Sequence, residues 1–153
     1  MHFKFWKKKP KEPPKEEKKV VSPLEELCGD DKELYSVLKR TLIEPTRTTI
    51  EETIVKAEEF KKKGDKNYAR MEFTHAGSLA IYKGDLNLAK SYYRKALEED
   101  PEWPGKWILE YFFSDKAEKA MEIAKAYYSK LEEAKAYYSK LEETKKPEAK
   151  PKP

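Results

Sequence analysis

Glutamine is absent from this 153-residue chain, and asparagine occurs only twice, as Asn67 and Asn87. Charged residues make up 41% of the chain, and most of them are lysine or glutamate. This combination of few labile amides and many Lys/Glu pairs resembles the composition of hyperthermophile proteins. We therefore expect a thermophile source, although a long Lys/Glu-rich helical protein of a mesophile would have the same composition.

Cysteine occurs once, at Cys28, which excludes an internal disulfide, and no Cys/His spacing of a zinc site is present. No apolar run approaches the roughly 20 residues that span a bilayer. The charged N-terminus lacks the apolar stretch of a cleavable signal sequence. We expect a single cytoplasmic domain. Its ten tyrosines are too many for a wholly disordered chain.

The net charge of +4 is unevenly distributed. Residues 1–19 carry a net charge of +5 and residues 144–153 a net charge of +3, whereas the middle of the chain carries −4. Proline and lysine are poorly suited to a core. We therefore expect a helical domain over residues 22–143. On either side we expect basic Pro/Lys-rich tails over 1–21 and 144–153, both disordered in isolation.

The first tail begins with three aromatic residues, Phe3, Phe5 and Trp6, between basic residues. Aromatic side chains in a flexible end are costly unless they are buried. We favour docking of these three side chains onto the chain's own helical body over their anchoring in a groove of a partner protein. A bilayer interface ranks third because the apolar patch is short, so a membrane is the least favoured partner.

Capping residues and glycines divide the middle of the chain into helices. Either Asp30 or Asp31 is expected to cap the second helix, and either Thr48 or Thr49 the third. The first predicted helix covers 23–28, and the second ends before Pro45. The next two cover 49–63 and 66–83, and a fifth follows Asp85. The sixth covers 104–113, and a long last helix, capped by Ser114 or Asp115, runs to about Thr144.

Two segments repeat at a shift of twenty residues: GDKNYARMEFTHA over 64–76 and GDLNLAKSYYRKA over 84–96. Each copy starts with a glycine that suits the positive φ of a helix end and an aspartate that caps the next helix. At one matching position the two copies also carry an aromatic ring, Phe73 or Tyr93, among alanines that permit close helix approach. The repeat predicts stacked antiparallel helices joined by minimal turns.

Residues 70–103 resemble one tetratricopeptide repeat. The matching positions are Phe73, Ala76, Gly77, Ala80, Gly84, Asp85, Ala89, Tyr93, Ala96 and Pro101. The flanking helices match the family less well. The resemblance implies an all-α, tetratricopeptide-repeat-like antiparallel helical array, an α-solenoid fragment with degenerate flanking helices.

The same resemblance implies a concave groove faced by the first helix of the repeat. The residues that would face it are Thr74, His75, Ser78, Ile81 and Tyr82. Thr74 and Ser78 stand where the family's carboxylate-clamping lysine and asparagine would be. This difference argues against carboxylate clamping, and the remaining surface, which is mixed polar and aromatic, is consistent with a neutral or amphipathic peptide as the occupant.

The decapeptide AKAYYSKLEE occurs twice in tandem, over 124–133 and 134–143. Its apolar residues follow a heptad rhythm through the last helix, so the first copy can pack on the array while the second overhangs it. We interpret Tyr137 and Tyr138 as contact residues for a second copy of this chain or another protein. The alternative is a duplication that only lengthens a solvated helix.

No pattern of catalytic side chains was found. The only histidines are His2 and His75, the adjacent glutamate pairs point about 100° apart on a helix, and no phosphate-binding loop is present. We predict no enzyme, no metal site and no cofactor. The favoured function is a protein-interaction adaptor or scaffold. The alternative is a structural component of a ribonucleoprotein that contacts RNA through its basic tails.

Overall fold

The computed structural model describes residues 21–145, which form an all-helical domain without strands. The all-α prediction is confirmed for this part of the chain. Its elements, in order, are α1 (Pro23–Cys28), α2 (Lys32–Thr41), α3 (Ile50–Lys62), α4 (Lys66–Tyr82), α5 (Leu86–Glu99), α6 (Lys106–Glu110), the 3-10 helix η2 (Tyr111–Phe113) and α7 (Ala117–Lys145).

Side-chain caps start each helix from α1 to α5. The capping residues are Ser22, Asp31, Thr49, Asp65 and Asp85. Asp31, not Asp30, caps α2, with its Oδ1 accepting from the Leu34 N–H at 3.0 Å. Thr49, not Thr48, caps α3 and forms a reciprocal capping box with Glu52.

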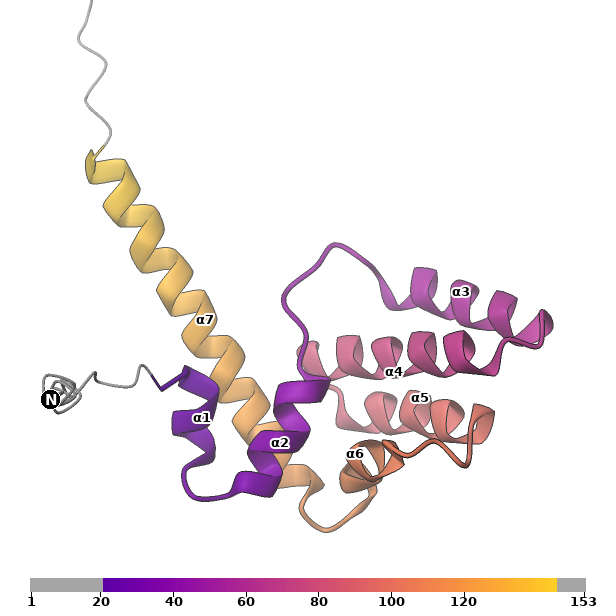
Figure 1. The fold of residues 1–153 in the computed structure, drawn as a ribbon. Coiled ribbons are helices and arrows are strands. Elements are labelled where there is room, and N and C mark those ends of the chain that lie inside the picture. The colour runs from indigo at the N-terminus through magenta and orange to yellow at the C-terminus, as the bar shows by residue number, and fades with distance from the viewer. Residues whose placement is uncertain (1–20, 146–153) are drawn as a thin grey trace, which may run out of the picture.

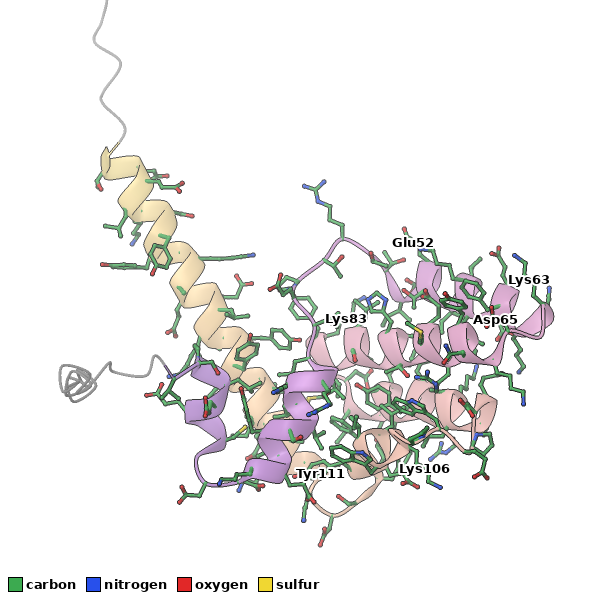
Figure 2. The ribbon with its side chains drawn as sticks, viewed as in Figure 1. Glu52, Lys63, Asp65, Lys83, Lys106 and Tyr111 are labelled. Carbon is green, nitrogen blue, oxygen red and sulfur yellow. The ribbon has the colours of Figure 1, made fainter. Side chains whose placement is uncertain are left out.

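Helices α3, α4 and α5 lie side by side, with α4 between the other two (Figure 1). Gly64 and Gly84 make the two connecting turns with φ of 77° and 82°, as the repeat predicts. Figure 2 shows Asp65 and Lys83 at opposite ends of α4. The repeated Gly-Asp pair therefore reverses the chain at both ends of this central helix.

The contact between α4 and α5 requires a glycine. A Cβ atom added to Gly77 on α4 would lie 2.3 Å from Cε1 of Tyr93 on α5. The Tyr93 side chain is fully enclosed, shares a 3.0 Å hydrogen bond with the Ser78 hydroxyl, and contacts the Phe112 ring at 5.1 Å between centroids. This burial raises the pKa of the Tyr93 phenol.

Helix α7 passes α1 and α2 and then extends beyond the rest of the domain (Figure 1). Its first half buries Ala117, Ala120, Met121, Ala124 and Tyr128. From Glu132 to Lys140, every residue is exposed. The first decapeptide thus packs on the domain and the second overhangs it. Of the two tyrosines in the first copy, Tyr128 is more deeply buried than Tyr127.

Two helix boundaries differ from the prediction. The expected helix over 104–113 begins only at Lys106, because a turn precedes it in which the Lys106 N–H donates to the Trp103 carbonyl at 3.1 Å. Its last three residues form the tighter 3-10 helix η2. The last helix begins at Ala117, because the Ser114 hydroxyl instead accepts from the Lys116 N–H at 3.1 Å in the preceding turn.

Cys28 is buried, and its burial raises the pKa of the thiol. Among the helices of residues 21–145, none is both long enough and apolar enough to cross a membrane. The predicted tails fall almost entirely outside this range, and so do Phe3, Phe5 and Trp6.

Candidate functional site

A cavity of about 390 Å³ opens beside α4. Three parts of the chain enclose it: the C-terminal end of α2 with Ile43, two residues beyond the helix, the middle of α4, and the loop after α5 with α6. The lining residues are Arg40, Thr41, Ile43, Arg70, Met71, Thr74, His75, Ser78, Trp103, Ile108 and Leu109. We call this the α4 cavity.

Arg70 occupies an enclosed position in the wall of the α4 cavity, with 8% of the residue exposed. Its guanidinium carbon lies 4.1 Å from the centroid of the Trp103 ring, and its Nη2 donates to Asn67 Oδ1. Its Nε has no hydrogen-bond partner, since Asp100 Oδ2 lies 3.8 Å away. Burial lowers the pKa of the guanidinium, and the Asp100 carboxylate opposes this shift.

Hydroxyl groups in the cavity wall already have partners within the protein. Thr41 donates to the Val37 carbonyl at 2.9 Å, and Thr74 donates to the Arg70 carbonyl at 2.8 Å. The Ser78 hydroxyl shares its bond with Tyr93. These groups are therefore poorly placed to supply new hydrogen-bond donors to a ligand.

Charge in the α4 cavity is of one sign. Arg40 and Arg70 line it together with the imidazole of His75, and none of the described residues that line it is acidic. Arg40 is exposed, and its Nη1 donates to both the carbonyl and the hydroxyl oxygen of Ser36, at 2.9 and 2.7 Å. The cavity therefore combines cationic donors with apolar walls.

The structure brings three of the five predicted groove residues together in this cavity: Thr74, His75 and Ser78. Ile81 does not line the cavity, and the residue is 1% exposed within the core. Tyr82 does not line the cavity. Its ring packs edge-on against Tyr128 at 4.8 Å between centroids, between α4 and α7.

Sequence reasoning missed Arg70, Trp103 and Arg40 as cavity residues. Arg70 could have been found, because it lies four residues before Thr74 and so on the same face of α4. Trp103 comes from the loop after α5 and Arg40 from the end of α2. Only the tertiary fold places those two beside Arg70.

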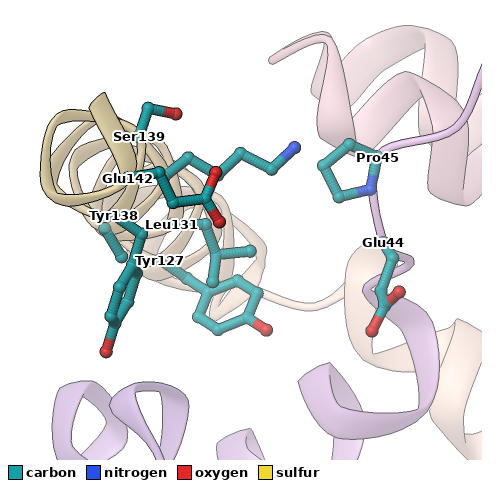
Figure 3. Close-up of a pocket in the computed structure, with 9 residues that line it drawn as sticks. Glu44, Pro45, Tyr127, Leu131, Tyr138, Ser139 and Glu142 are labelled. Carbon is teal, nitrogen blue, oxygen red and sulfur yellow. The ribbon is translucent and has the colours of Figure 1, made fainter. Parts of the chain in front are cut away.

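A second cavity, of about 510 Å³, lies between α7 and the loop that follows α2 (Figure 3). Glu44 and Pro45 form its loop side. Its α7 side consists of Tyr127, Leu131, Ala134, Lys135, Tyr138, Ser139 and Glu142. Tyr138 is 64% exposed and Tyr137 is 61% exposed. Of these two predicted contact residues, Tyr138 lines this cavity.

Within residues 21–145, no cluster of three or more His, Cys, Asp or Glu side chains is arranged to hold a metal ion. Comparison with models of protein families, with curated proteins and with solved structures found no match to this chain. The two cavities and the exposed half of α7 must therefore be interpreted from their own geometry.

Proposed function

We propose that this chain is a non-catalytic adaptor or scaffold that binds a segment of a partner protein in the α4 cavity. In this proposal, α3, α4 and α5 with their neighbours act as a degenerate tetratricopeptide-repeat-like array. Two observations support the array: the Gly-Asp turns at both ends of α4, and the close contact of Gly77 with Tyr93.

The observation that carries the proposal is the composition and size of the α4 cavity. Its volume of about 390 Å³ falls within the roughly 300–1,000 Å³ of typical ligand sites. Apolar walls with a few convergent polar groups are also typical of such sites. The hydroxyls of Thr74 and Ser78 are engaged within the protein, which supports binding rather than nucleophilic catalysis.

Selection from a random-peptide library with the full chain tests this function. We expect enriched peptides that bind the unmodified chain but not a Thr74→Trp variant, because the indole would fill the cavity. Thr144→Trp is the matched control, since it makes the same exchange at an exposed position of α7. The absence of any enriched peptide, or equal binding by the Thr74→Trp variant, would contradict the proposal.

The ribonucleoprotein alternative depends on the basic tails, most of which lie outside the described residues. It predicts that the chain binds single-stranded RNA with a strong salt dependence. The same full-length preparation can therefore be titrated with RNA at two salt concentrations, as a direct comparison with peptide binding.

A further inference from the structure

Arg70 carries a charge that its surroundings compensate incompletely. The residue is almost fully buried, its Nε lacks a hydrogen-bond partner, and its ion pair with Asp100 is long, with 3.8 Å between Nε and the carboxylate oxygen. A buried charge is costly unless it is paired and hydrogen-bonded. An anionic group that entered the α4 cavity beside this guanidinium would reduce that cost.

The available donors in the cavity are cationic or imidazole groups. The hydroxyls of Thr41 and Thr74 already donate to backbone carbonyls. The remaining donors are the guanidinium groups of Arg40 and Arg70 and the ring of His75. Since the lining contains no carboxylate among the described residues, the polar part of a ligand is expected to be an acceptor and an anion.

The other walls of the cavity are apolar. Its apolar lining residues are Ile43, Met71, Ile108 and Leu109, and the Trp103 ring covers the guanidinium of Arg70. Met71 is 48% exposed, so part of this apolar surface is open to solvent. A ligand that fills the cavity therefore needs an apolar group close to its anion.

We infer that the occupant is a peptide segment in which an aspartate or glutamate carboxylate accepts hydrogen bonds from the Arg70 guanidinium while a neighbouring apolar side chain packs on the half-exposed Met71. This inference rests on the proposed function and names the chemistry of the partner. Of the neutral or amphipathic peptides expected from the sequence, it selects an amphipathic and acidic one. Arg70 matters here because its planar, always charged fork suits carboxylates.

Peptides enriched in the library selection provide the first test. We expect them to share an acidic residue next to an apolar one, and replacement of that residue by its amide to weaken binding about ten- to hundredfold. This replacement leaves the protein unchanged, so a folding defect cannot cause the loss. Peptides that bind in the α4 cavity without needing an acidic residue would overturn this inference while leaving the proposed function intact.

Protein variants complete that test. We expect Arg70→Lys to weaken binding of the acidic peptide about tenfold, because lysine has no planar fork. The matched control is Arg94→Lys on α5, which makes the same exchange at an exposed arginine 5.1 Å from the Phe113 centroid and outside the cavity. Equal losses in the two variants would contradict a specific role for Arg70.

If no library peptide is enriched, a small probe can still test the inference about an acidic ligand separately from the proposed function. Acetyl-Leu-Glu-amide and acetyl-Leu-Gln-amide can be titrated into ¹⁵N-labelled full chain while the Arg70 Nε–H resonance is observed. The acidic probe should shift that resonance, and its amide counterpart should not. An unchanged resonance with both probes would overturn the inference, and an equal response to inorganic phosphate would show a general anion site without peptide specificity.

Discussion

The Tyr128 hydroxyl forms two hydrogen bonds with the backbone of Ile43. It donates to the Ile43 carbonyl at 2.7 Å and accepts from the Ile43 N–H at 3.1 Å. Tyr128 belongs to the first AKAYYSKLEE copy on α7, and Ile43 lies just after α2. This pair fixes the first copy to the domain, whereas its counterpart in the second copy, Tyr138, is 64% exposed.

The duplication provides a matched comparison of one substitution in two environments. Tyr128→Phe should destabilise the domain by about 1–3 kcal/mol, because it leaves both backbone groups of Ile43 without their partner. Tyr138→Phe should change the free energy of unfolding by no more than about 0.5 kcal/mol, as for other exposed sites. Urea unfolding of both variants measures the difference. Equal effects would show that the Tyr128–Ile43 pair contributes nothing in solution.

Alkaline pH should weaken the same contact. Burial raises the pKa of Tyr128 to about 12, above the value of about 10 for an exposed tyrosine. The folded state therefore retains this proton at a pH where the unfolded chain has lost it. The stabilisation is complete below about pH 10 and decreases as the pH rises toward the folded pKa of about 12.

The measurement is the free energy of unfolding across this alkaline range. We expect Tyr128→Phe to flatten the decline without abolishing it, because burial also raises the pKa of Tyr93. An identical decline in the variant and in the unmodified chain would contradict the assignment of this pH dependence to Tyr128.

Gly77→Ala tests the close approach of α4 and α5. In an open helix this exchange would stabilise by about 1 kcal/mol. Here the added methyl group would overlap the Tyr93 ring, and overpacking costs about 1–3 kcal/mol. We expect net destabilisation in thermal unfolding, with the loss reduced in a Tyr93→Leu background. A stabilised Gly77→Ala variant would show that the two helices are less tightly packed.

Local signals in the sequence predict most of the helix boundaries. Glycine and aspartate act within a few residues of their own position, so the turns at Gly64 and Gly84 and the caps at Asp65 and Asp85 follow from sequence alone. The start of α6 does not follow from the sequence alone. The turn before it is closed by a hydrogen bond to the Trp103 carbonyl, and the Trp103 ring lies against Gly105.

The candidate site is less predictable than the fold. Helix α4 packs on α3, α5 and α7, so apolar residues surround most of it and do not mark which face borders a cavity. The family resemblance places Ile81 on the groove face of this helix, whereas Ile81 lies in the core. Likewise, the sequence cannot tell which tyrosine of the first decapeptide is buried, because that choice depends on Ile43.

The exposed half of α7 leads to a prediction about self-association. Lys135 and Glu142 line the same cavity, seven residues apart on one face of the helix. In an antiparallel pair of helices related by a two-fold axis between Tyr138 and Ser139, Lys135 of each copy would face Glu142 of the other. Because so short a helix pair would bury less than the roughly 1,200 Å² of stable interfaces, we expect a weak homodimer.

Sedimentation equilibrium over a range of protein concentrations measures this association. Lys135→Glu should abolish the dimer through like-charge contacts, and the double variant Lys135→Glu/Glu142→Lys should restore it. Lys130→Glu is the control, since Lys130 is also exposed on α7 but does not line the cavity. A chain that stays monomeric at millimolar concentration would contradict the pairing.

Binding of a partner segment in the α4 cavity is tested most directly by a ¹⁵N NMR titration of the full chain with a library-selected peptide. We expect chemical-shift changes at the backbone amides of Thr74, His75 and Ser78 and at the Trp103 indole N–H, with the resonances of residues 134–143 unchanged. Changes confined to α7, or none at saturating peptide, would contradict binding in this cavity.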